Sequence, residues 1–174
     1  MAQHLGPLEL VGDRWVIGDP MRKDGLCVAL TPEGLEQRRG EQTAPRLAVE
    51  WSQFVELKVR AAYRSWHATP GGGFVGAFAT GAETGHDGCS LHGILRHPYE
   101  LWEARYTHHR RRYTGGHVMV LKALFDQLTE AKALERLGDP EWLGSAVAKL
   151  SSTTSWYAPK ASRLVEATIR SLGT

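Results

Sequence analysis

The sequence predicts an α+β protein in which a seven-stranded antiparallel barrel or sandwich comes first and helices follow it. The first half contains short apolar runs of period two separated by turn residues, a pattern typical of antiparallel strands. From Pro98 onward the apolar residues recur at about 3.6 positions, which is the period of an α-helix. A chain of 174 residues with 42% apolar content is long enough to bury one such core.

Seven segments have the length and composition of strands. The clearest is the strand that begins at Phe54, where Val55, Leu57 and Val59 alternate strictly with Glu56, Lys58 and Arg60. One face of it is therefore expected to be buried and the other solvated. The turn sequence TPEG predicts that residues 26–39 form a hairpin. The seven predicted strands are residues 13–17, 26–30, 35–39, 46–51, 54–63, 74–80 and 89–95.

Four helices are predicted after the change of period. Gly115 and Gly116 are expected to end the first of them, because glycine is common at helix C-termini. Asp139 and Pro140 have the residue types of an N-cap and a first helical position, and Pro159 is expected to begin the last helix in the same way. The predicted helices are residues 99–113, 117–137, 139–150 and 159–172.

Two phrases, GLCVALTPEGLEQRRGE and VEWSQFVELKV, describe a hairpin around a TPEG turn, then a strand ending in Trp51 and a one-turn connection into the next strand. This pattern resembles that of bacterial pleckstrin-homology-like (PH-like) domains over roughly residues 10–130. The resemblance implies a partly open barrel capped at one end by a helix. We expect residues 1–130 to form this unit and residues 131–174 to form a helical extension packed on it.

Composition narrows the class of protein. The formal net charge of +2 is too small for binding to a polyanion over the whole surface, so any anion site must be local. Cys27 and Cys89 are the only cysteines and lack the spacing of a disulfide framework. The sequence shows neither a signal peptide pattern nor an apolar run of membrane-spanning length. We therefore expect a reduced, cytoplasmic protein.

Positive charge gathers between Arg96 and Lys122, where six Lys or Arg and two acidic residues give a net charge of +4. Arginine binds carboxylates and phosphates in bidentate fashion, so this segment predicts contact with an acidic protein surface or an anionic membrane. The alternative is a solvated helix end, where cations oppose the helix dipole. The candidate binding residues are Tyr106, His109, Arg110, Arg111, Arg112 and Tyr113.

The same segment suggests a second function, binding of nucleic acid. Tyr106, Arg110 and Tyr113 would lie at positions i, i+4 and i+7 of the predicted helix 99–113. Aromatic rings interleaved with cations on one exposed face are typical of proteins that bind single strands.

A third hypothesis is a metal-dependent enzyme that uses the His/Cys cluster 86–97, whose members are His86, Cys89, His92 and His97. Cys89 and His92 are separated by an odd number of residues, so in a strand they would point to opposite faces. Surface histidines are the simpler interpretation, and neither an H-E-x-x-H nor a G-x-S-x-G motif is present.

The sequence thus favours a noncatalytic binding or scaffold module without a cofactor or metal. Contact is expected through the helix around Tyr106 to Tyr113, or through a groove between the barrel and its capping helix. The oligomeric state is left open.

Overall fold

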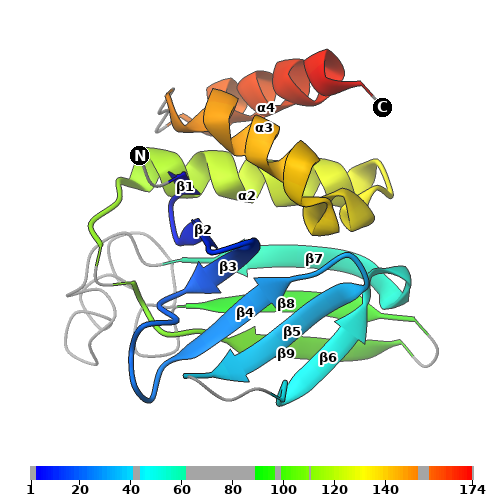
Figure 1. The fold of residues 1–174 in the computed structure, drawn as a ribbon. Helices are drawn as coiled ribbons and strands as arrows, with labels where there is room; N and C mark the ends of the chain where they lie inside the picture. The colour runs from blue at the N-terminus through cyan, green and yellow to red at the C-terminus, as the bar shows by residue number, and fades with distance from the viewer. Residues whose placement is uncertain are drawn as a thin grey trace, which may run out of the picture.

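The computed structural model describes residues 3–40, 44–61, 89–96, 99–109, 111–152 and 157–173. In this part of the chain, antiparallel strands form two sheets, and the α-helices lie together along one side of them (Figure 1). The strands are β1 His4–Leu5, β2 Leu8–Val11, β3 Arg14–Gly18, β4 Leu26–Leu30, β5 Gly34–Arg39, β6 Leu47–Glu50, β7 Phe54–Arg60, β8 Ser90–Leu95 and β9 Glu100–Arg105. The helices are α2 Gly115–Glu130, α3 Pro140–Ser151 and α4 Ala158–Leu172, with 3-10 turns η1 Trp51–Gln53 and η3 Leu134–Gly138.

Strands β1 to β6 pair in sequence order to form a six-stranded sheet, and β7, β8 and β9 form a three-stranded sheet. The apolar faces of both sheets contribute to a single hydrophobic core, because alternate side chains of each strand point inward. Contributors from the sheets include Trp15, Ile17, Leu35, Leu57, Leu91 and Trp102.

The predicted α+β class and the antiparallel pairing are confirmed. The predicted strand number is wrong: the described residues contain nine strands, and the two sheets do not close into one barrel. Six of the predicted strands correspond to β3 through β8. The predicted strand 74–80 lies outside the described residues. Strands β1 and β2 were not predicted. Their turns are marked by Gly6 and Gly12, which have φ of 61° and 63°.

The predicted helix 99–113 is also wrong. Residues Glu100–Arg105 form β9, which pairs with β8, and a loop follows. In this strand Trp102 and Ala104 face the core, and Tyr106 continues the same period of two. Trp102 and Tyr106 are four residues apart, which also fits the spacing of a helix. Ala104 lies between them on the same face of the strand, but it is too small to stand out as a core residue in the sequence. Pairing with β8 decides between the two patterns, because it satisfies the backbone hydrogen bonds of one edge.

Gly115 and Gly116 begin α2, contrary to the expectation that they end a helix. Thr114 is the N-cap, and its Oγ1 accepts a hydrogen bond from the backbone N–H of His117 at 3.3 Å. The helix ends before its predicted end because Lys132 adopts a φ of 54°, which is not compatible with a right-handed helix.

The last two helices begin as predicted. The Asp139 carboxylate accepts hydrogen bonds from the N–H groups of Glu141 and Trp142, both at 3.0 Å, and caps α3. Helix α4 buries Ala161 and Val165, which belong to the same hydrophobic cluster as the sheet residues. Both helices therefore share the core of the protein.

Candidate functional site

The predicted binding segment is the connection between β9 and α2, and its two tyrosines belong to the core. Tyr106 and Tyr113 are only 3% and 7% exposed. The Tyr106 hydroxyl donates a hydrogen bond to the Arg60 carbonyl at 2.6 Å. Burial raises the pKa of both phenols well above the usual range. These side chains anchor the connection and offer little aromatic surface to a ligand.

Two other candidate residues in this connection bind the N-terminal hairpin. His109 Nε2 lies 2.6 Å from Glu9 Oε1, and Arg111 Nε and Nη2 each donate to Glu9 Oε2 at 3.3 Å. Arg111 Nη2 also donates to the Gly6 carbonyl at 3.1 Å. The Glu9 carboxylate thus offsets the positive charge of Arg111 within the fold. Arg112 is exposed, and Arg110 lies outside the described residues.

The arrangement that predicted nucleic-acid binding is absent from the described residues. That prediction needed Tyr106 and Tyr113 to project from one exposed helical face, whereas both are buried and no helix covers the segment. Stacking of bases requires accessible ring faces. Nucleic-acid binding through this segment is therefore not retained.

The His/Cys cluster is divided between two faces of β8. Cys89 is buried in the core, whereas His92 lies on the outer face beside Glu103, so the prediction that they point apart is confirmed. His86 and His97 lie outside the described residues. In the described segments no group of three or more His, Cys, Asp or Glu is arranged to hold a metal ion.

Ser90, His92 and Glu103 lie together on the outer face of the three-stranded sheet. Ser90 Oγ is 2.6 Å from His92 Nε2, and Glu103 Oε1 is 3.9 Å from the same nitrogen. A catalytic triad needs the acid at the ring nitrogen opposite to the one that faces the serine. Here both partners meet one nitrogen, and Ser90 is fully buried. Glu103 therefore does not take the place of the acid in such a triad.

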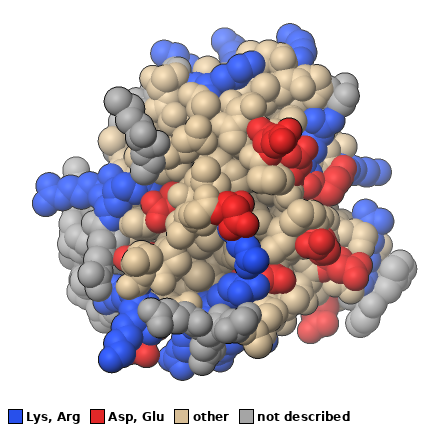
Figure 2. Space-filling view, in the orientation of Figure 1, with Lys and Arg blue, Asp and Glu red and all other residues tan. Residues whose placement is uncertain are grey.

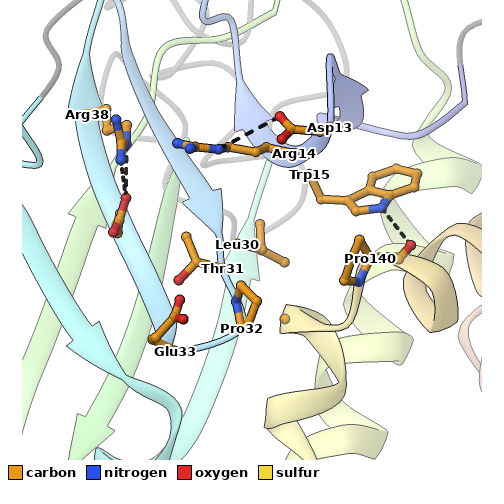
Figure 3. A pocket seen from close by; sticks show the side chains of 11 residues that line it. Asp13, Arg14, Trp15, Leu30, Thr31, Pro32, Glu33, Arg38 and Pro140 are labelled. Atoms are coloured by element: carbon orange, nitrogen blue, oxygen red, sulfur yellow. Dashed lines mark hydrogen bonds and ion pairs between the residues drawn. The ribbon is translucent and has the colours of Figure 1, made fainter.

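An open hollow of about 310 Å³ lies between the larger sheet and the start of α3 (Figure 3). Trp15 and Pro140 border one side of it, and their contact is fixed by a hydrogen bond of 3.3 Å from Trp15 Nε1 to the Pro140 carbonyl. Arg14 and Arg38 reach over it from β3 and β5. None of these residues was predicted to line a binding site, because they come from segments that are distant along the chain.

The hollow has charges of both signs. Arg38 pairs with Glu36, and Arg14 Nε lies 3.9 Å from an Asp13 carboxylate oxygen. The surrounding face likewise carries acidic and basic side chains with uncharged surface between them (Figure 2). This lining offers hydrogen-bonding groups but no cysteine, histidine or serine that would serve as a nucleophile or base.

The two edges of the three-stranded sheet differ. At the β7 edge, the N–H of Leu57 donates to Thr129 Oγ1 at 3.4 Å, and the Thr129 hydroxyl donates to the Leu57 carbonyl at 3.2 Å. Helix α2 therefore covers this edge. A ligand was expected in a groove between the sheet and this helix, but at Leu57 the two elements are in direct contact. The covering keeps this edge from pairing with other chains, as uncovered strand edges readily do.

The β9 edge lies at the other border of the sheet (Figure 1). The N–H of Tyr106 donates to the Cys89 carbonyl at 2.9 Å, whereas the Arg105 carbonyl accepts from the Gln37 side chain of the other sheet. Backbone groups of an antiparallel strand alternate in direction, so those of Leu101 and Glu103 point away from β8. The Leu101 side chain is 87% exposed. Within the described residues, this is a strand edge without a covering element at Leu101 and Glu103.

No family model matches the chain, and neither a curated protein nor a solved structure matches it. None of the described helices is long and apolar enough to cross a membrane.

Proposed function

We propose that this protein is a noncatalytic binding module with a PH-like core, and that it binds an extended segment of a partner protein along β9. The observation that carries the proposal is the 87% exposure of Leu101 on an open strand edge. Added strands bind to such edges through main-chain hydrogen bonds, and alternate side chains give specificity.

The PH-like assignment is part of the proposal. Apart from the β1-β2 hairpin, seven described strands, β3 through β9, precede α2. An antiparallel shell followed by a helix is the arrangement that the PH-like resemblance implies, and this order of elements supports it. Helix α2 packs against β7 and so caps one side of the sheets.

A protein partner fits β9 better than a membrane does. Strand β9 presents backbone N–H and C=O groups at its outer edge. Another polypeptide strand can form hydrogen bonds with all of them, whereas a lipid surface cannot. The Glu9 carboxylate already binds Arg111, so the loop before α2 has less positive charge with which to bind an anionic membrane. The net charge of +4 between Arg96 and Lys122 still favours acidic side chains in the partner segment.

A synthetic peptide tests this proposal without knowledge of the natural partner. The probe alternates valine and threonine, with a leucine at its centre and a glutamate at each end. In a ¹⁵N–¹H NMR titration we expect it to shift the amide signals of Leu101 and Glu103 more than those of the covered Leu57. The same peptide with N-methyl groups at alternate residues cannot pair and is the matched control.

Two variants separate backbone pairing from side-chain effects. Glu103→Pro removes an N–H that points away from β8, so it is expected to abolish peptide binding while the ladder with β8 remains. Glu103→Gln keeps the N–H and should bind as the wild type does. Equal binding by Glu103→Pro, with a folded spectrum, would contradict the proposal.

A further inference from the structure

We propose that a second copy of this chain occupies the β9 edge, so that two three-stranded sheets join into one six-stranded antiparallel sheet. This inference rests on the proposed function and names its partner. It depends on the directions of the backbone groups of β9, on the exposed Leu101 and on the position of Glu103.

The outward backbone groups of β9 are self-complementary. Tyr106 bonds to β8, and so do the even-numbered residues before it, which leaves Leu101 and Glu103 to face outward. In a two-fold symmetric antiparallel pair, outward residues must meet outward residues, because side chains opposite one another share a face. Only registers that pair odd-numbered residues are therefore allowed.

Three such registers pair Leu101 and Glu103 with themselves or with one another. Arg105 is left out because its carbonyl already accepts from the Gln37 side chain. One puts Glu103 opposite Glu103 of the second copy, and like charges directly opposite destabilise a strand pair. A second puts Leu101 opposite Glu103 of the second copy, which sets an exposed apolar side chain against a charge. The third puts Leu101 opposite Leu101 of the second copy.

The register that pairs Leu101 with Leu101 of the second copy avoids both of these unfavourable pairings. It brings together the two side chains that are 87% exposed in the single chain. It also separates the two Glu103 residues by four positions along the strand direction, which is roughly 13 Å. Each Glu103 carboxylate keeps its own neighbours, since its Oε1 lies 3.6 Å from Arg105 Nε within the same chain. The charges thus select the register, and the leucines stabilise it.

Cysteine cross-linking tests the register directly. Residues opposite one another in a hydrogen-bonded antiparallel pair have Cα atoms about 5.5 Å apart, which is within the range of a disulfide. Leu101→Cys is therefore expected to form a covalent dimer on mild oxidation. Glu103→Cys is the matched control and should stay monomeric on a denaturing gel, because its partner is too distant. Both native cysteines are buried, so they do not compete.

Sedimentation equilibrium tests the assembly without a cross-link. The wild type is expected to form a dimer as its concentration rises, and Leu101→Lys or Glu103→Pro should raise the dissociation constant by at least about tenfold. Glu103→Gln should dimerise no more weakly than the wild type. Efficient cross-linking of Glu103→Cys but not of Leu101→Cys would overturn the proposed register.

The outcomes also separate this inference from the proposed function. A wild-type protein that stays monomeric at the highest soluble concentration, yet shows shifts of the Leu101 and Glu103 amides with the synthetic peptide, refutes self-pairing and leaves the proposed function standing. A monomer without such shifts refutes both. A dimer that is unaffected by Leu101→Lys and Glu103→Pro uses another surface and also refutes the inference.

Discussion

Glu9 and His109 stand one hundred positions apart in the sequence, yet His109 Nε2 lies 2.6 Å from Glu9 Oε1. Arg111 binds the second oxygen of the same carboxylate. The three side chains are only 11% to 23% exposed, so water screens the charges of Glu9 and Arg111 less than it screens a surface ion pair. This contact joins the N-terminal hairpin to the connection that leads into α2.

Replacement of Glu9 by Gln is expected to lower the free energy of unfolding by about 1 to 3 kcal/mol, because the partly buried Arg111 loses its charged partner. Urea denaturation measures the change. Asp13→Asn is the control, since the Asp13 side chain is 93% exposed and its contact with Arg14 is 3.9 Å long. That substitution should change stability by less than about 0.5 kcal/mol. Equal effects of the two substitutions would contradict the assigned role of Glu9.

The Thr129 hydroxyl is expected to protect the β7 edge. Thr129→Val keeps the shape of the side chain but leaves the N–H and C=O of Leu57 without this partner, at a cost of about 1 to 3 kcal/mol. Hydrogen exchange of the Leu57 amide should become faster by the corresponding factor. Thr129→Ser retains the hydroxyl and should protect that amide nearly as well as the wild type. Unchanged exchange in Thr129→Val would show that the helix covers this edge by other means.

Two glycines near the junction of sheet and helices are expected to respond oppositely to alanine. A Cβ atom at Gly138 would lie 2.3 Å from the Thr31 carbonyl oxygen and 2.5 Å from Trp51 Nε1, so Gly138→Ala must displace the junction. We expect a loss of at least about 2 kcal/mol. A Cβ atom at Gly144 would lie 3.8 Å from its nearest neighbours, which is ordinary contact. Gly144 lies inside α3, and a helix interior is more stable with alanine than with glycine. Gly144→Ala should raise stability by up to about 1 kcal/mol. Thermal unfolding of both variants checks the pair, and a stabilised Gly138→Ala would show that η3 is not held closely against the sheet.

Alkaline pH is expected to unfold the protein through its buried tyrosines. Burial raises the pKa of Tyr106 and Tyr113 above the ordinary value of about 10, so the folded state holds these protons more tightly than the unfolded chain does. The resulting stability is complete below the unfolded pKa and is lost as pH rises above it. Absorbance of phenolate should show two tyrosines that ionise only together with the loss of circular dichroism. Ionisation of every tyrosine near pH 10 with the fold intact would contradict this assignment.

Several elements could be predicted from the sequence because their local signals agree with the tertiary environment. The alternation at 55–60 describes a strand with one buried face, and Leu57 and Val59 of β7 lie on that face. Val55 is exposed and Phe54 is buried instead, at a shift in the pairing with β8. Asp139 followed by Pro140 specifies the start of α3 through hydrogen bonds within one turn, so distant residues are not needed to predict it. The Cys89 and His92 side chains diverge simply because a strand alternates.

Where local signals were ambiguous, contacts between distant segments determined the outcome. The spacing of Trp102 and Tyr106 fits a helix and a strand alike, and only the presence of β8 as a neighbour made the segment a strand. Likewise, a glycine pair fits either end of a helix, and the Thr114 cap placed Gly115 and Gly116 at the beginning.

The sequence by itself determined the α+β class, most of the strands and the two C-terminal helices, because backbone alternation and helix capping act over a few residues. Tertiary structure alone decided which charges remain available. Arg111 is neutralised by Glu9, a residue no local pattern connects to it. The outward backbone groups of Leu101 have no neighbouring strand in the described residues because β9 ends its sheet. Coulombic pairing and strand order join residues that are far apart along the chain, so the order of residues alone did not reveal either result.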